Sequence, residues 1–172
     1  MIHGFLRVAA ATPVIRTADC FYNADQILAC VDAAPEDTAL LVFPELCLTG
    51  YTCGDLFLST PLLTAAESAL RRILAATVGK EAVLLIGLPV SVGSGLYNCA
   101  AVCQRGNLLG LVPKTQLPAY AEFYEARHFT PATESPLTVT YAGQQTVMDR
   151  RQIFACRSMP EFRLGVEICE DL

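Results

Sequence analysis

The sequence predicts an α/β protein, and three observations support this fold class. Apolar runs alternate along the chain with segments that have helical periodicity. The apolar runs are continuous rather than alternating with polar residues, which is typical of strands covered on both faces of a sheet. Hydrophobic residues make up 53% of the 172 residues and charged residues only 17%, so one domain with a substantial core is expected.

The first half of the chain is predicted to form a buried strand, a helix, a second strand and a second helix. In order, these segments are residues 5–11, 23–33, 40–43 and 61–78. Asn23 is a residue type that caps helix N-termini, and Pro35 stops the first helix. Pro61 opens the second helix and Gly79 closes it, in the usual order of proline at the start and glycine at the end.

The second half is predicted to consist mainly of strands and loops. Gly93 and Gly95 mark a turn, residues 105–107 mark another, and a long loop is expected from about 113 to 136. No internal repeat or domain boundary is evident in the sequence. The predicted strands are residues 82–90, 97–104, 108–112, 153–155 and 164–168.

Charge and hydropathy argue against two classes of partner. The formal net charge is −5 and no basic cluster occurs, so no nucleic-acid surface is expected. The longest apolar run, residues 82–90, is too short to span a bilayer, so no membrane partner is expected. The apolar start is interrupted by Arg7 and Pro13, unlike a signal peptide. Together these features predict a soluble protein.

The eight cysteines favour a reducing compartment over a disulfide framework. An even count suits disulfides, yet Cys30, Cys99 and Cys103 lie within apolar segments, where cysteine usually acts as a small buried hydrophobe. No CxxC pair occurs, so no metal site is expected. We therefore expect a cytoplasmic protein. A disulfide-rich binding module is kept as a minor alternative.

Three reactive residues directly follow predicted strands, where active sites of α/β sheets are usually built. Glu45 follows strand 40–43, Lys114 follows strand 108–112, and Cys169 follows strand 164–168. A cysteine thiolate can attack an amide, a carboxylate can take the thiol proton and later activate water, and an ammonium can stabilise the oxyanion. These three residues predict acyl transfer from an amide.

Each of these residues also has a simpler explanation. Glu45 alone could be a solvated or helix-capping carboxylate, Lys114 alone is more often a surface lysine, and Cys169 alone is more often a buried structural thiol. Cys47 and Cys53 are rival nucleophiles, although neither follows a well-formed strand. A Cys–His pair is disfavoured because the chain contains only two histidines, His3 and His128.

Three blocks of sequence, in order, resemble the signatures of the nitrilase superfamily of carbon-nitrogen hydrolases. They are FPELCLTGY, PKTQLPAYAEFYEARHF and GVEICEDL. The resemblance implies that Glu45 is the general base, Lys114 stabilises the oxyanion and Cys169 is the nucleophile. It also implies a second glutamate after the lysine, for which Glu125 is the better match and Glu122 the other candidate.

Within the superfamily, the strings FPELCLTGYTCGDLF and EICEDL are most similar to the N-terminal glutaminase domain of glutamine-dependent NAD synthetases. That resemblance implies glutamine hydrolysis, with Tyr120 contacting the substrate. Ammonia would then serve the amidation of deamido-NAD in a synthetase domain of the same parent chain, and ATP and Mg²⁺ would bind there. No GxxxxGK phosphate loop occurs in this sequence, so no cofactor is expected here.

The resemblance also implies an α-β-β-α sandwich and a homo-oligomer. We interpret residues 1–172 as the N-terminal portion of a nitrilase-type glutamine amidohydrolase domain, with an incomplete sandwich and no synthetase domain, because the sequence stops just after Cys169. Two alternatives remain. One is another amidase or carbamoylase of the superfamily, and the other is a catalytically incomplete fragment that serves at most as an assembly surface.

Overall fold

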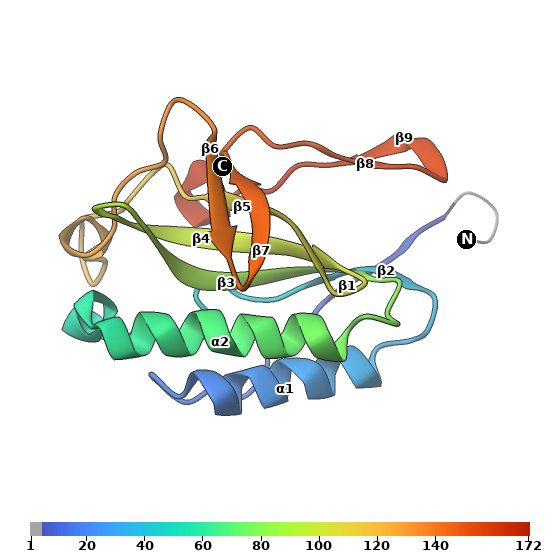
Figure 1. Ribbon diagram of the computed structural model, residues 1–172, viewed down its shortest axis with the longest axis horizontal. Helices are drawn as coiled ribbons and strands as arrows, with labels where there is room; N and C mark the ends of the chain where they lie inside the picture. Colours follow the sequence, from blue (N-terminus) through green and yellow to red (C-terminus); the bar gives the residue numbers. More distant parts are fainter. Residues whose placement is uncertain (1–4) are drawn as a thin grey trace.

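The computed structural model describes residues 5–172 and places most strands in one seven-stranded mixed sheet (Figure 1). The strand order across this sheet is β1-β2-β3-β4-β5-β7-β6. The strands are β1 (Arg7–Ala10), β2 (Thr38–Val42), β3 (Val83–Val92), β4 (Gly95–Gln104), β5 (Asn107–Pro113), β6 (Leu137–Tyr141) and β7 (Gln144–Met148). A separate two-stranded sheet comprises β8 (Phe154–Cys156) and β9 (Met159–Leu164).

Two α-helices, α1 (Cys20–Ala33) and α2 (Thr60–Ala76), lie side by side beneath one face of the sheet (Figure 1). Three short 3₁₀ turns complete the structure: η1 (Gly54–Leu58), η2 (Glu125–Arg127) and η3 (Cys169–Asp171). Proline in the first turn of α2 fits the prediction from Pro61. The buried residues of α2 recur every three to four positions, which turns one stripe of the helix toward the sheet.

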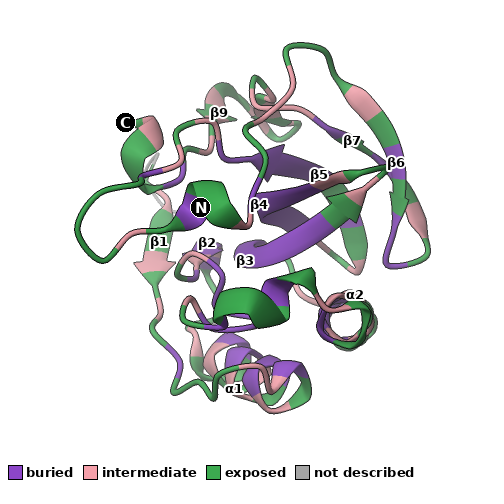
Figure 2. Cartoon of the chain, turned by 90° about the vertical axis from the view of Figure 1, so that its left-hand side faces the viewer, coloured by how far each residue is buried: buried purple, intermediate pink, exposed green. Residues whose placement is uncertain are grey.

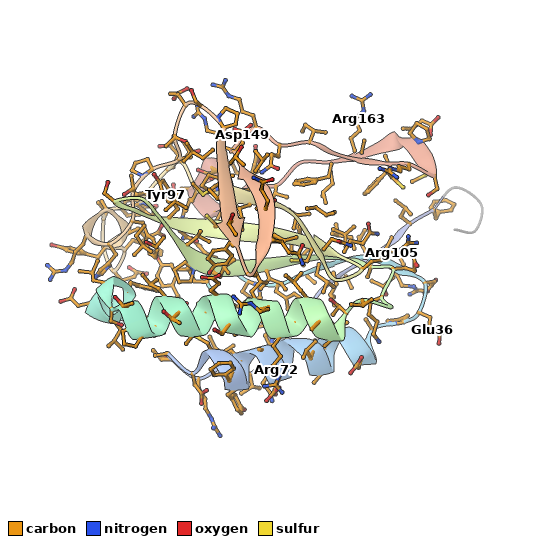
Figure 3. All side chains as sticks on the ribbon, in the orientation of Figure 1. Glu36, Arg72, Tyr97, Arg105, Asp149 and Arg163 are labelled. Carbon is orange, nitrogen blue, oxygen red and sulfur yellow. The ribbon has the colours of Figure 1, made fainter. Side chains whose placement is uncertain are left out.

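The central strands are buried on both faces, as their continuous apolar runs predict (Figure 2). Leu84 and Ile86 of β3 belong to the large core between the sheet and the helices. Leu85, between them, belongs to a smaller cluster on the opposite face, where Phe154 and Val166 pack against it. Charged side chains lie at the periphery, and Glu36, Arg105 and Arg163 in Figure 3 are exposed.

The pairing directions within the sheet place the C-terminal ends of β2 and β5 at the same end of the sheet. β2 runs parallel to β3, β3 is antiparallel to β4, and β4 is antiparallel to β5. β5 therefore has the same direction as β2. The β4–β5 connection is a tight turn in which Arg105 and Gly106 both have positive φ, the geometry favoured by twisted hairpins.

Two predicted features of the first half of the chain are wrong in detail. The cap of α1 is Asp19, whose side chain accepts a hydrogen bond from the Tyr22 amide. Asn23 instead lies inside the helix and is fully buried. The predicted buried strand at residues 5–11 shortens to β1, which is largely exposed because it lies at the edge of the sheet.

Two features of the second half also differ from the prediction. The hairpin β6–β7 was not predicted; its strands are only half buried, and its turn at Ala142 and Gly143 has positive φ at both residues. The predicted buried strand at residues 164–168 is wrong, because the strand β9 ends at Leu164 and residues 165–168 have no pairing partner in the described part of the chain. Within that same part, no helix is long and apolar enough to cross a membrane.

Asn23 joins the segment before α1 to the turn after β2. Its Oδ1 accepts a hydrogen bond from the Arg16 amide at 2.7 Å, and its Nδ2 donates to the carbonyls of Arg16 at 2.8 Å and Leu48 at 3.1 Å. A buried amide with three backbone partners is costly to remove, because those partners lose their hydrogen bonds in a place that water reaches poorly.

We predict that Asn23→Ala lowers the free energy of unfolding by about 1–3 kcal/mol. Chemical denaturation monitored by circular dichroism measures this change. The control is Asn107→Ala, which removes only exposed bonds within the β4–β5 turn and is expected to change stability by no more than about 0.5 kcal/mol. Equal losses in the two variants would contradict the role of Asn23.

Candidate active site

Because β2 and β5 end at the same end of the sheet, Glu45 and Lys114 lie together, although 69 residues separate them in sequence. Glu45 lies in the turn after β2, and Lys114 follows the last residue of β5. The Lys114 amide donates a hydrogen bond to the carbonyl of Asn98 on β4 at 2.8 Å, so its backbone is fixed to the centre of the sheet.

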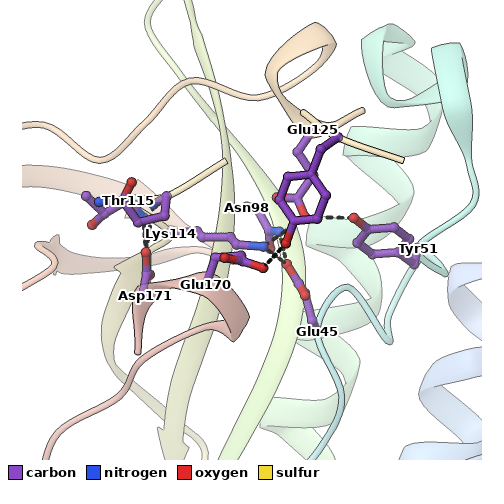
Figure 4. A network of polar contacts seen from close by, with 10 residues as sticks. Glu45, Tyr51, Asn98, Lys114, Thr115, Glu125, Glu170 and Asp171 are labelled. Atoms are coloured by element: carbon purple, nitrogen blue, oxygen red, sulfur yellow. Dashed lines mark hydrogen bonds and ion pairs between the residues drawn. The ribbon is translucent and has the colours of Figure 1, made fainter. Parts of the chain in front are cut away.

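The Lys114 ammonium is buried and lies between two carboxylates (Figure 4). Its Nζ donates to Oε1 of Glu45 at 2.7 Å and to Oε1 of Glu125 at 2.8 Å. Burial by itself lowers the pKa of Lys114, but the hydrogen bonds and charges of Glu125 and Glu45 outweigh it and raise the pKa above its ordinary value. The two carboxylates therefore favour the protonated form of the lysine.

Two further polar side chains hold the carboxylates, and neither was identified from the sequence. Asn98 Nδ2 donates to Oε1 of Glu45 at 2.6 Å, and the Tyr51 hydroxyl donates to Oε1 of Glu125 at 2.7 Å. Burial and the contact with Glu125 raise the pKa of Tyr51, so the phenol keeps its proton and remains a donor. Two features of the sequence could have indicated them: Asn98 is a lone amide side chain inside the apolar run of β4, and Tyr51 is the aromatic residue of the LTGY string.

The turn that carries Glu45 lies directly on Gly87 of β3. The Leu48 amide donates to the Gly87 carbonyl at 3.1 Å. A Cβ atom at Gly87 would lie 2.3 Å from the Leu46 nitrogen and 2.6 Å from the Pro44 carbonyl oxygen, which is too close for any side chain. Glycine at this position therefore lets the turn approach the strand.

Cys169 begins the 3₁₀ turn η3 and is exposed, with φ of 53°, a left-handed conformation uncommon outside glycine. It lines a cavity of about 140 Å³ together with Glu45 and Asn98. The structure thus places an exposed thiol and a carboxylate on one cavity, and the buried Lys114 contacts that carboxylate. Of the three residues predicted from the sequence, Glu45 and Cys169 line the cavity, and Lys114 lies behind Glu45.

The two residues that follow Cys169 contact the segment after Lys114 (Figure 4). The Tyr120 hydroxyl donates a hydrogen bond to the Glu170 carboxylate. The Asp171 carboxylate accepts hydrogen bonds from the Thr115 and Gln116 amides. Tyr120 is 56% exposed, so it lies at the surface of the site rather than within the buried network.

Of the two candidates for a second glutamate, Glu125 lies in the network and Glu122 does not. Glu125 is 4% exposed and contacts Lys114, whereas Glu122 is exposed.

An ion pair at the surface connects the loops that carry Tyr51 and Glu125: Arg127 donates to both carboxylate oxygens of Asp55, at 2.9 and 3.0 Å. Arg127 and the nearby His128 lower the pKa of Asp55 to about 2.

The rival nucleophiles have environments that suppress thiolate formation. Cys47 is buried with its thiol on the Gly87 carbonyl, and burial raises its pKa to about 12. Burial also raises the pKa of Cys53, whose thiol contacts the Thr49 and Gly50 carbonyls. All eight cysteines lie within the described residues, and none forms a disulfide.

The structure describes one of the two histidines of the chain. His128 contacts Asp55, and His3 lies outside the described residues. Among residues 5–172 no group of three His, Cys, Asp or Glu side chains is arranged to hold a metal.

This site geometry is accompanied by a family match over almost the whole chain. The sequence profile of the carbon-nitrogen hydrolases matches residues 7–172. The chain belongs to the carbon-nitrogen hydrolase family. This membership fits the nitrilase-like α/β fold predicted from the three signature blocks.

Relatives of this carbon-nitrogen hydrolase include glutamine-dependent NAD(+) synthetases of Mycobacterium tuberculosis and Xanthomonas campestris. The first is 40% identical over 99% of this chain and the second 35% identical over 97%. The chain spans 25% and 27% of these two proteins, or about a quarter of their length.

Two solved structures are also similar to this carbon-nitrogen hydrolase. The crystal structure of a glutamine-dependent NAD(+) synthetase from Cytophaga hutchinsonii has a TM-score of 0.86 at 28% identity, and the match covers 97% of this chain and 28% of that one. A mutant amidase from Nesterenkonia sp. AN1, whose active-site cysteine carries the acetamide moiety of fluoroacetamide, has a TM-score of 0.61 at 25% identity, over 84% of this chain and 55% of that one.

We predict that Gly87→Ala displaces the turn that carries Glu45 and lowers the free energy of unfolding by about 1–3 kcal/mol, because the new Cβ meets backbone atoms. Thermal unfolding measures this loss. Gly79→Ala is the matched control, since a Cβ there meets no atom within 4 Å. A Gly87→Ala variant as stable as Gly79→Ala would contradict the close approach.

Proposed function

We propose that this chain is the catalytic part of a glutamine amidohydrolase that uses Glu45, Lys114 and Cys169. One observation carries the proposal: the buried Lys114 ammonium bridges Glu45 and Glu125 beside the cavity that Cys169 lines. A fixed cation, a carboxylate and an accessible thiol around one cavity are the groups that hydrolysis of an amide through a thioester requires.

In the proposed reaction, Glu45 accepts the thiol proton of Cys169, and the thiolate attacks the amide carbon. Lys114 stabilises the negative charge that develops on the carbonyl oxygen. The tetrahedral intermediate collapses as the C–N bond breaks, and the leaving nitrogen takes the proton from Glu45, releasing ammonia. Glu45 then accepts a proton from water, and the hydroxide attacks the thioester carbon. The C–S bond breaks, the carboxylic acid product leaves, and the proton held by Glu45 restores the Cys169 thiol.

The roles of Glu125 and Tyr120 in this proposal are supporting ones. Glu125 holds the Lys114 ammonium on the side opposite Glu45, with Tyr51 as its donor. Tyr120 contacts the substrate beside Glu170, to which its hydroxyl donates.

Similarity to the mycobacterial NAD(+) synthetases supports the wider role that we propose for the parent protein. Ammonia released here would serve the ATP-dependent amidation of deamido-NAD in a synthetase domain of the same parent chain, where ATP and Mg²⁺ would bind. We further propose that the parent is a cytoplasmic homo-oligomer. Similarity to the Nesterenkonia amidase keeps a simple amide as the second candidate substrate.

The first test measures ammonia release from glutamine by the 172-residue chain and, separately, by the full-length parent protein. Release by the natural protein supports the proposal, and the result for the 172 residues shows whether they form a complete site by themselves. If the natural protein ignores glutamine but hydrolyses a simple amide such as acetamide, the glutamine assignment is wrong and another amidase activity replaces it.

We predict that Cys169→Ala lowers glutamine hydrolysis by at least about 10³-fold, because it removes the nucleophile. Cys47→Ala is expected to keep most of the activity, since that thiol is buried against a carbonyl. Ammonia release by folded variants measures both. Comparable losses in the two variants would reject Cys169 as the nucleophile.

A second pair of variants separates the two candidate glutamates. Glu125→Gln is expected to lower kcat by about 10²-fold, because Lys114 loses one of its two anionic partners and shifts from its place. Glu122→Gln removes an exposed charge of the same loop and is expected to stay near the wild-type rate. An active Glu125→Gln variant beside an inactive Glu122→Gln variant would reverse the assignment.

A further inference from the structure

We propose that Asp171 is a positioning residue that holds the turn carrying Cys169 against the backbone that carries Lys114. Oδ1 of Asp171 accepts hydrogen bonds from the Thr115 amide at 2.9 Å and the Gln116 amide at 2.7 Å, and Oδ2 accepts a second contact from Thr115 at 3.2 Å. Asp171 lies two residues after Cys169, and Thr115 directly follows Lys114.

The other side of this connection is already rigid. The Lys114 amide donates to the Asn98 carbonyl, and the Lys114 carbonyl accepts from the Ala132 amide at 3.0 Å. A carboxylate that accepts two backbone donors forms charge-assisted hydrogen bonds, which are shorter and stronger than neutral ones. Asp171 therefore joins the nucleophile turn to a fixed point of the sheet rather than to a loose loop.

Packing fixes only part of the nucleophile segment: Ile168 is buried and Val166 packs against the cluster around Leu85, whereas Cys169 is exposed. Val166 and Glu167 border both the site cavity of about 140 Å³ and a second cavity of about 310 Å³ on the side of Arg150 and Arg151. Where it borders a cavity, the segment lacks some of the close contacts that fix side chains in a core. Cys169 is also in a left-handed conformation, which the surrounding structure must maintain. The hydrogen bonds of Asp171 supply this restraint.

The donors at this contact are backbone amides, so only a change at position 171 removes the contact cleanly. Asp171→Ala removes both acceptors. Asp171→Asn keeps an oxygen that accepts both amides, as Oδ1 does here, but lacks the charge. The matched control is Asp149→Ala: the Asp149 carboxylate also accepts a backbone amide, that of Arg151 at 3.1 Å, but this bond lies within its own loop.

This inference rests on the proposed function, because kcat for glutamine is one readout. In the longest natural protein that carries the chain, Asp171→Ala is expected to lower kcat by about 10²-fold with little change in KM, because the thiol shifts away from Glu45 and Lys114. Asp171→Asn is expected to lose only about threefold to tenfold, and Asp149→Ala to match the wild type.

A second readout needs no substrate. Iodoacetamide alkylation of Cys169, followed on its peptide by mass spectrometry, is expected to slow in Asp171→Ala and to recover largely in Asp171→Asn. A merely structural role would lower the melting temperature and leave both rates of the folded protein unchanged, and that result would overturn the inference. If Asp171→Ala does not fold, wild-type kcat and alkylation in Asp171→Asn would overturn it.

The two readouts separate the two proposals. A wild-type protein that does not hydrolyse glutamine rejects the proposed function, while alkylation still decides the role of Asp171. A wild-type protein that hydrolyses glutamine, with alkylation and kcat both insensitive to position 171, rejects only the positioning role.

Discussion

The candidate site depends on one interaction, the contact of the buried Lys114 ammonium with two carboxylates. A lysine with about 1% of its surface exposed is unfavourable unless its charge is matched, and here Glu45 and Glu125 match it from opposite sides. Asn98 and Tyr51 hold the same two carboxylates through hydrogen bonds that their side chains donate. Each member of the network therefore depends on the others for its position.

The sheet supplies the geometry that this network requires. Because β2 and β5 have the same direction, their last residues lie at the same end of the sheet. The antiparallel strand β4 contributes Asn98 near that end. Gly87 lets the turn after β2 lie directly on β3, which brings the Glu45 carboxylate into reach of Lys114. Cys169 reaches the same cavity from an irregular segment rather than from a strand. This difference makes the placement of the thiol depend on polar contacts more than on the sheet.

Much of the fold follows from local patterns in the sequence. Continuous apolar runs predict β2 to β5, because strands covered on both faces have few polar residues. The predictions fail where a local signal has more than one use. Asn23 is a common cap, but its amide is used here to join three backbone groups inside the core. Residues 164–168 have the composition of a strand, yet a strand exists only where a partner strand lies beside it.

The sequence by itself determined which reactive side chains are candidates for the site: Glu45, Lys114 and Cys169, each within its own sequence block. Tertiary structure alone decided how these side chains are placed. Tyr51 meets Glu125 across 74 residues, Asn98 meets Glu45 across 53, and Asp171 meets Thr115 across 56. Contacts at such separations arise from strand order and direction, which no local pattern encodes. The same contrast applies to Cys47: its residue type allows thiolate chemistry, but its burial in the tertiary structure raises the pKa of the thiol.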